Sequence, residues 1–189
     1  VGLIFSNVTP GEHDATLGVI PNHCYTHSRT VRSLAIYAQS IGMGAGMSIR
    51  RQTLSAIGLL DEHLGPGSTL FSGEDHDMAI RAIIHEWWVY EAAEVSVLHH
   101  GFRTFQMFSQ LTRRDWVALG AVHAKFLKCG QWQVWPLIIY NTLVRGLWQP
   151  LAMLLELKRP TGFRRFVHYW EGFYRGWRTP VDRQRLVYC

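Results

Sequence analysis

Three acidic residues lie within four positions in the segment Gly73-Glu74-Asp75-His76-Asp77. Carboxylates this close repel one another, so the cluster does not favour folding by itself. It needs a cation, a bound metal or a role in proton transfer, unless it is the solvated first turn of a helix, where acids suit the helix dipole. The spacing alone leaves a catalytic and a structural interpretation open.

A second candidate group is His99-His100-Gly101, at the end of a β-type run. A histidine at a strand end can bind a divalent metal through one ring nitrogen. A lone exposed or core histidine is the more frequent outcome. The pair therefore indicates a metal site only if other evidence agrees.

Three glycines at alternate positions, Gly42, Gly44 and Gly46, form a third unusual segment within residues 41–50. Glycine at this density usually lets the backbone approach another group closely. The alternative is a strand or turn weakened by glycine.

The elements that must position these residues follow from hydrophobic spacing and from turn residues. The pattern predicts an α/β protein in which strands precede and follow a helix that begins near Glu74. A helix over 50–57 should end at Gly58, a favourable C-cap residue. The remaining expectations are a strand over 1–8, a long loop over 11–40 with a short helix at 32–39, a helix from 74 to about 85, short strands over 87–90 and 95–98, and helices over 103–128, 131–157 and 161–176.

Charge divides the chain into two parts. Residues 1–100 carry five Lys/Arg and ten Asp/Glu, whereas residues 101–189 carry fourteen Lys/Arg, four Asp/Glu and six of the eight Trp. This asymmetry predicts two units with different roles, residues 1–102 and residues 103–189.

The second unit is basic, rich in Trp and helical. Its longest uncharged run, Cys129–Val144, ends at Arg145 and is shorter than the roughly 20 apolar residues of a membrane span. Helices of this composition often lie in the membrane interface. The alternative is that their apolar faces pack on the first unit or on a partner subunit.

The three cysteines lie far apart and show no zinc-site spacing. A sparse, odd number of cysteines fits a reducing compartment. With the basic, Trp-rich helices, this predicts a cytoplasmic protein that is peripheral on the cytoplasmic face of the membrane.

The order of motifs over residues 41–103 is specific: a Gly-rich segment ending in Arg-Arg, a helix, a Gly-rich loop, Glu-Asp-x-Asp, and two short strands ending in His. This order resembles the C-terminal half of the catalytic domain of family 2 glycosyltransferases, which have the GT-A fold. Residues 1–40 resemble it more loosely. The resemblance implies a partial GT-A-like domain followed by an amphipathic helical extension.

The resemblance assigns roles to individual residues. Asp75 matches the general base that removes the proton from an acceptor hydroxyl as the oxygen attacks and inverts the anomeric carbon. Glu74 matches a neighbouring residue that binds or positions the acceptor. Asp77 is expected to support the start of the helix or Arg81 instead.

The remaining site residues also follow from the resemblance. The segment Gly44-Ala45-Gly46-Met47 matches backbone that runs beside the donor sugar and the acceptor. His99, or His100 in its place, matches a histidine that helps to hold the catalytic metal. Arg103 is positioned to bind diphosphate oxygens, a common use of guanidinium.

One departure from the family is large. Relatives hold Mn²⁺ or Mg²⁺ with an Asp-x-Asp motif. The only acidic residues within 1–40 are Glu12 and Asp14, which are separated by a histidine and do not form this motif. The resemblance therefore implies a fragment whose main metal and donor ligands lie in a missing N-terminal half. We expect such a chain to turn over slowly or not at all by itself.

The leading expectation is an inverting glycosyltransferase, or a fragment of one. It would move a sugar from a nucleotide-diphosphate donor to a lipid-linked or polysaccharide acceptor at a membrane surface. The alternative is a non-catalytic, degenerate partner that docks on an active enzyme or on membrane lipid. Nucleic acid is disfavoured as a partner, because the cations are spread through apolar helices and no nucleic-acid motif is present.

Overall fold

The computed structural model describes residues 1–38, 42–157 and 162–189. Its strands are β1 (Leu3–Pro10), β2 (Gly18–Val19), β3 (Arg29–Val31), β4 (Met47–Ile49), β5 (Val89–His99), β6 (Arg103–Thr104), β7 (Val181–Asp182) and β8 (Val187–Tyr188). Its helices are α1 (Leu34–Tyr37), η1 (Gly44–Gly46), α2 (Arg51–Ile57), α3 (Glu74–Ile84), α4 (Phe105–Lys128), η2 (Trp132–Val134), α5 (Trp135–Ile139), η3 (Tyr140–Trp148), α6 (Gln149–Leu155) and α7 (Phe163–Arg178).

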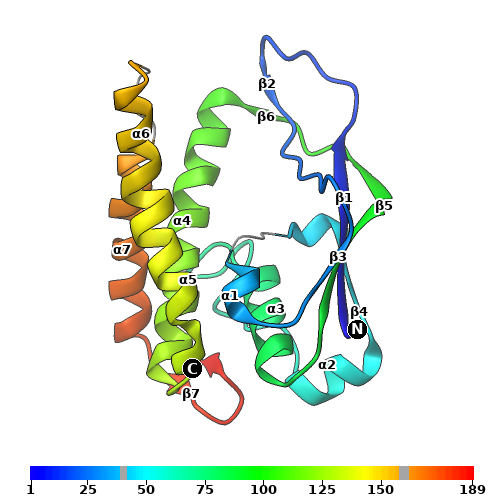
Figure 1. Cartoon of the computed structure of the whole chain (residues 1–189), viewed down its shortest axis with the longest axis vertical. Helices are drawn as coiled ribbons and strands as arrows, with labels where there is room; N and C mark the ends of the chain where they lie inside the picture. Colours follow the sequence, from blue (N-terminus) through cyan, green and yellow to red (C-terminus); the bar gives the residue numbers. More distant parts are fainter. Residues whose placement is uncertain (39–41, 158–161) are drawn as a thin grey trace.

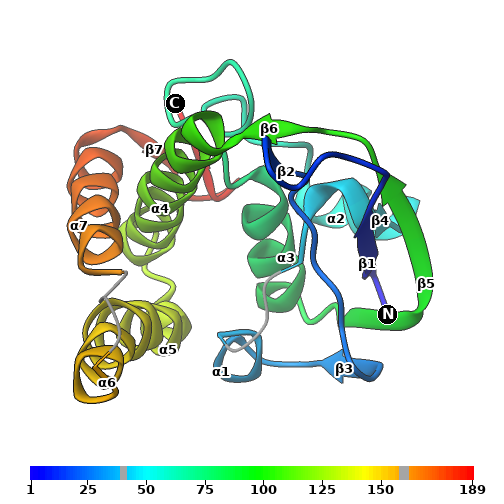
Figure 2. The ribbon, with the colours of Figure 1, turned by 90° about the horizontal axis from the view of Figure 1, so that it is seen from above.

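A four-stranded sheet of order β3-β5-β1-β4 forms one layer. Strands β1 and β5 are parallel, and the edge strands β4 and β3 run antiparallel to their neighbours. Helices α1 and α3 lie beside the sheet, and α4 to α7 form a further layer beyond them (Figures 1 and 2). The α/β class predicted from the sequence is therefore confirmed.

Strand β5 corrects the prediction of two short strands over 87–90 and 95–98. It is one strand whose pairing with β1 shifts register, because Ser6 lies opposite Ala92 and Asn7 lies opposite Ser96. The Asn7 side chain fills the irregularity, since its Nδ2 donates to the Ala93 carbonyl oxygen at 2.9 Å. A bulge of this kind interrupts the period-2 pattern without ending the strand.

Other element predictions hold with smaller changes. Helix α2 ends at Gly58, whose φ is 83°, and α3 begins at Glu74 as expected. The loop over 11–40 also contains β2 and β3, which pair with β6 and β5 and which the sequence did not indicate. The expected short helix is α1; Gln39, at its predicted end, lies outside the described residues.

The predicted helix over 131–157 is instead a succession of η2, α5, η3 and α6. The segment η3 is a π-helix of nine residues, a rare conformation that is frequently found at functional sites. Pro136 and Pro150 lie at the first turns of α5 and α6, where a missing N–H costs little.

Close helix packing joins α4 to α7. A Cβ atom on Gly120 would lie 1.9 Å from the Tyr169 carbonyl oxygen, and one on Gly172 would lie 1.8 Å from the Val117 carbonyl oxygen. Only glycine allows two helix backbones to approach this closely. The two long helices of the basic half therefore form one rigid pair.

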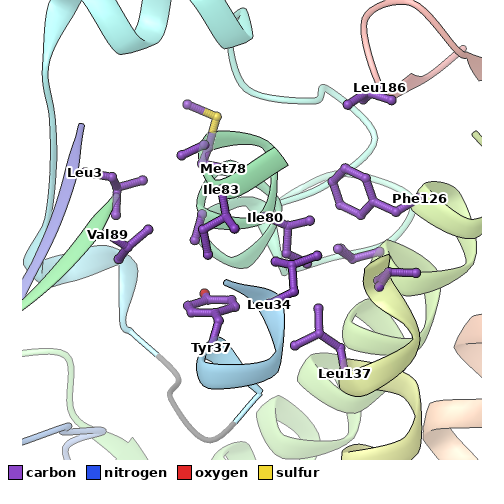
Figure 3. Packing of buried hydrophobic residues seen from close by; sticks show 14 of the residues in the cluster. Leu3, Leu34, Tyr37, Met78, Ile80, Ile83, Val89, Phe126, Leu137 and Leu186 are labelled. Carbon is purple, nitrogen blue, oxygen red and sulfur yellow. The ribbon is translucent and has the colours of Figure 1, made fainter. Parts of the chain in front are cut away.

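The hydrophobic core is shared by both halves of the chain. It contains Leu3 and Val89 of the sheet, Ile80 of α3, and Phe126 and Leu137 of α4 and α5 (Figure 3). The core therefore does not divide at residue 102, and the division of roles at that position stays a prediction. Among the described residues, no helix combines the length and apolarity needed to cross a bilayer.

Candidate active site

A pocket of about 540 Å³ opens between the start of α3, the Gly-rich segment, the end of β5 and the helices α4 and η3. Both halves of the chain line it: Glu74 and Asp75 come from the first, and Asp115, Trp116 and Arg145 come from the second. A cavity of this size is typical of a small-molecule site.

Asp75 is held at the first turn of α3. The helix begins after Gly73, whose φ of 93° favours glycine. The Asp75 Oδ1 atom accepts a hydrogen bond from the His76 backbone N–H at 2.7 Å, and Oδ2 accepts one from the Gly44 N–H, also at 2.7 Å. The carboxylate is thereby fixed in orientation, and each oxygen keeps a lone pair for a ligand.

The environment raises the pKa of Asp75 to about 6. Burial is the main cause, and the neighbouring charge of Glu74 acts in the same direction. The hydrogen bonds from His76 and Gly44 lower the pKa and only partly offset these effects. A carboxyl with a pKa near neutral is suited to general base chemistry.

Two further acids surround Asp75. The Glu74 Oε2 atom is buried and has no hydrogen-bond partner among the described residues, which is costly for an acceptor. Burial raises the pKa of Asp115, although its Oδ1 accepts a hydrogen bond from the Ser72 hydroxyl at 2.8 Å. This acidic wall is therefore matched to a ligand that donates hydrogen bonds, such as a sugar.

The Gly-rich segment is only partly at the pocket. Gly44 and Ala45 line it, whereas Gly46 lies against β1, where a Cβ would be 2.6 Å from the Ser6 carbonyl oxygen. Met47 begins β4 and packs against the core. The structure thus brings Gly44 and Ala45 to Asp75 and places Gly46 and Met47 outside the lining of the pocket.

The two candidate metal histidines differ in position. His99 lines the pocket, and its Nδ1 donates to the Pro21 carbonyl oxygen at 2.9 Å, which leaves Nε2 with a free lone pair. The His100 ring is exposed and lies against Gly11. Arg103 also lines the pocket, and its Nη1 donates to the Phe102 carbonyl oxygen at 2.8 Å.

A metal centre is not completed by these residues. In the part of the chain that the structure describes, no group of three or more His, Cys, Asp or Glu side chains could hold a metal ion. His99 would be a single ligand, whereas Mn²⁺ and Mg²⁺ prefer several oxygen ligands. By themselves, the described residues do not complete a divalent-metal site.

Asp77 contacts Arg81, as the sequence predicted, and does not face the pocket. Its Oδ2 accepts a hydrogen bond from Arg81 Nε at 2.9 Å, and its Oδ1 lies 2.5 Å from Lys125 Nζ. Lys125 also contacts Asp61 Oδ2 at 2.7 Å. All four side chains are buried, and two anions balance two cations.

A second buried group connects α1, α3, α4 and α7. His76 Nδ1 lies 3.1 Å from the Tyr37 hydroxyl, its Nε2 lies 2.9 Å from His123 Nε2, and His123 Nδ1 lies 2.8 Å from the Tyr169 hydroxyl. Burial lowers the pKa of His76 to about 3 and that of His123 well below its usual value, so both rings are neutral. This series of hydrogen bonds fixes α3, the helix that carries Asp75, against the α4–α7 pair.

Sequence reasoning missed the contribution of the second half to the pocket. Asp115, Trp116 and Arg145 reach it only because α4 and η3 fold back over α3. One signal was present: Arg145 is the cation that interrupts the longest uncharged run of the chain. A charge placed there is expensive to bury and therefore indicates a role.

Comparison with protein-family models, with curated proteins and with solved structures found no match for this chain.

Proposed function

We propose that this chain carries the acceptor side of an inverting glycosyltransferase with a partial GT-A-like domain. The observation that carries the proposal is Asp75: a pocket carboxylate with a pKa of about 6, fixed by two backbone N–H groups. The proposal also builds on the mixed α/β sheet and on the helix that starts at the Glu-Asp pair.

The proposed reaction uses Asp75 as general base. An acceptor hydroxyl donates to a carboxylate oxygen of Asp75, and its proton moves to Asp75 as the acceptor oxygen attacks the anomeric carbon. The bond from that carbon to the donor diphosphate breaks, and the nucleoside diphosphate leaves with the bonding electron pair. Glu74, which also lines the pocket, accepts a second hydrogen bond from the acceptor.

The remaining parts of the proposal concern the donor. Gly44 and Ala45 present backbone to the sugar, and Arg103 contacts the diphosphate. A divalent ion, Mn²⁺ or Mg²⁺, would neutralise diphosphate charge when bound. His99 Nε2 would be one ligand, and the other ligands would come from outside this chain.

The acceptor is proposed to be membrane-associated, and the protein to lie on the cytoplasmic face. Helix α7 exposes one apolar stripe, with residues three and four positions apart along one face. Its members are Phe163, Val167, Trp170, Tyr174 and Trp177. On η2, η3 and α6, Trp132 is 67% exposed, Trp148 is 60% exposed and Leu155 is 73% exposed. Exposed Trp beside Arg is suited to the interface of an anionic bilayer.

The test of the catalytic role is Asp75→Asn in the complete protein. Release of nucleoside diphosphate from a panel of nucleotide-diphosphate sugars is measured with membrane extract as acceptor. We expect a loss of about 10²-fold or more, the usual contribution of a general base. Asp14→Asn, at an exposed loop position, is the matched control. Full activity of Asp75→Asn would refute the assignment.

The exposed apolar stripe also favours a second candidate, a non-catalytic partner that docks on membrane lipid. Flotation with anionic vesicles compares the wild type with the double change Val167→Gln and Tyr174→Gln on the outer stripe of α7. Loss of flotation in this variant, together with unchanged transfer in Asp75→Asn, favours the docking role. Flotation equal to that of the wild type excludes the α7 stripe as the lipid-binding face.

A further inference from the structure

Two arginines from different helices lie over one tryptophan ring beside the pocket. The Arg145 guanidinium of η3 is 4.6 Å from the centroid of the Trp116 ring, and the Arg165 guanidinium of α7 is 5.8 Å from it. The Trp116 side chain is buried and forms part of the pocket wall. The indole therefore holds two cations near each other at the edge of the candidate active site.

Neither cation has a carboxylate partner among the described residues. Among residues 1–38, 42–157 and 162–189, no carboxylate forms an ion pair with Arg145 or Arg165, and residues 39–41 and 158–161 include no Asp or Glu. The hydrogen bond that Arg145 makes within the described chain joins its Nη1 to Asn141 Oδ1 at 3.4 Å. Its donors therefore remain largely unused, whereas a guanidinium carries five of them.

The position of Arg145 is also costly. Burial lowers the pKa of Arg145, and the charge of Arg165 lowers it further. Burial is the main cause that lowers the pKa of His76, next to Asp75 in the sequence, and the charge of Arg145 lowers it further. Arg145 lies in the π-helix η3, and π-helical turns are frequent at functional sites.

We propose that Arg145 and Arg165, oriented by Trp116, form an anion site for a phosphate or diphosphate group. Paired guanidinium groups bind phosphate oxygens in a bidentate manner. Trp116 and Arg145 line the helical side of the pocket, and Arg165 lies over the same Trp116 ring. Arg103 lies in β6, and the acidic wall lies at the start of α3. The cationic and acidic sides of the pocket thus recognise different parts of a ligand.

This division identifies the acceptor class, a step that rests on the proposed sugar transfer. A phosphate-linked lipid sugar places its phosphate on Arg145 and Arg165 and a sugar hydroxyl on Asp75, with the lipid toward the exposed apolar residues of η3 and α6. The donor diphosphate is the other source of the same chemistry.

The test uses the full chain and two probes. Pyrophosphate protection against thermal unfolding reports a soluble diphosphate, because a ligand that binds the folded state raises the melting temperature. Flotation with phosphatidylcholine vesicles that contain phosphatidic acid, compared with phosphatidylglycerol at equal charge, reports a lipid phosphate monoester. Arg145→Gln and Arg165→Gln are compared with Arg164→Gln, the same change at the exposed neighbouring position on α7.

We expect Arg145→Gln and Arg165→Gln to weaken binding roughly tenfold or more relative to Arg164→Gln, as the loss of hydrogen bonds to a charged group predicts. If Arg145→Gln shows no cooperative unfolding transition, and so does not fold, Arg145→Lys is used in its place. Arg145→Lys is expected to bind the probes more weakly than the wild type.

Loss of phosphatidic acid binding alone assigns the lipid source, and loss of pyrophosphate protection alone assigns the donor. Both variants behaving like Arg164→Gln would overturn the site. Asp75→Asn is expected to bind both probes normally, so failure of the sugar-transfer proposal is distinguishable from failure of this one.

Discussion

Asp75 and Asp77 lie in the same turn of α3, yet their surroundings differ in every respect that matters for function. Asp77 is fully buried and contacts two cations, Arg81 and Lys125. Asp75 faces a pocket, contacts no cation among the described residues and has a pKa raised to about 6. Asp77 therefore stabilises the fold. Asp75 lies in an environment that is unfavourable for its charge, and a bound ligand could relieve this cost.

The comparison extends beyond these two residues. The two anions Asp61 and Asp77 are balanced by the two cations Arg81 and Lys125. The Tyr188 backbone N–H also donates to Asp61 Oδ2 at 2.9 Å. Around Asp75, the nearest charges are Glu74 and Asp115, which have the same sign. Pairing distinguishes a structural charge cluster from a functional one, because folding selects against unpaired buried charge.

The largest effect should come from breaking the balanced cluster. Lys125→Met leaves Asp61 without its cation and Asp77 with only Arg81. Removing one partner of a buried ion pair costs about 3–5 kcal/mol, so we expect a loss of this size in the free energy of unfolding, measured with urea. Lys128→Met, at a less buried position of the same helix, is the control. Equal losses in the two variants would show that the buried ion pairs of Lys125 add nothing to the free energy of unfolding beyond what Lys128 contributes.

The next effect concerns the unpaired acid. Because the pKa of Asp75 rises from 3.8 to about 6 on folding, the folded state holds a proton that the unfolded chain releases. Stability attributable to Asp75 is therefore lost as the pH rises from about 4 to about 6. The loss is at most about 3 kcal/mol and smaller to the extent that water in the pocket screens the charge.

Asp75→Asn removes this titration, and we expect its stability to lack the corresponding decline between pH 4 and pH 6. The check is a series of urea unfolding curves for both proteins across this range. A constant difference between wild type and variant would show that the pKa of Asp75 is not raised.

A smaller effect for each residue is expected at the His76–His123 pair. Burial keeps the folded-state pKa of both rings below 6.5, so the unfolded chain binds protons that the folded state excludes. Stability therefore falls as the pH drops below 6.5, by about 2 kcal/mol per ring at pH 5. His123→Gln keeps a hydrogen-bonding group and should halve this acid loss. His27→Gln, at an exposed position, is the control, and equal acid slopes in both variants would refute the idea.

The sequence predicted much of the first half because its signals are local. The C-cap Gly58, the acids at the start of α3 and the Arg81 partner of Asp77 all act over one or two helical turns. The register shift in β5 was not predictable, since it depends on Asn7 from a strand far away in the sequence. The same holds for His123 and Arg145, whose partners lie tens of residues away and leave no periodic pattern.

The smallest predicted effect tests whether the pocket acids act on one another. Of the two neighbouring charges that raise the pKa of Asp75, Glu74 has the larger effect and Asp115 the smaller. Glu74→Gln should therefore lower the pKa of Asp75, and Asp115→Asn should lower it by a smaller amount. Each change appears as a shift to lower pH in the decline of stability that Asp75 causes, measured against the same variant combined with Asp75→Asn. If Asp115→Asn moved the decline further than Glu74→Gln, the unfavourable charge at the pocket would come from α4 rather than from α3.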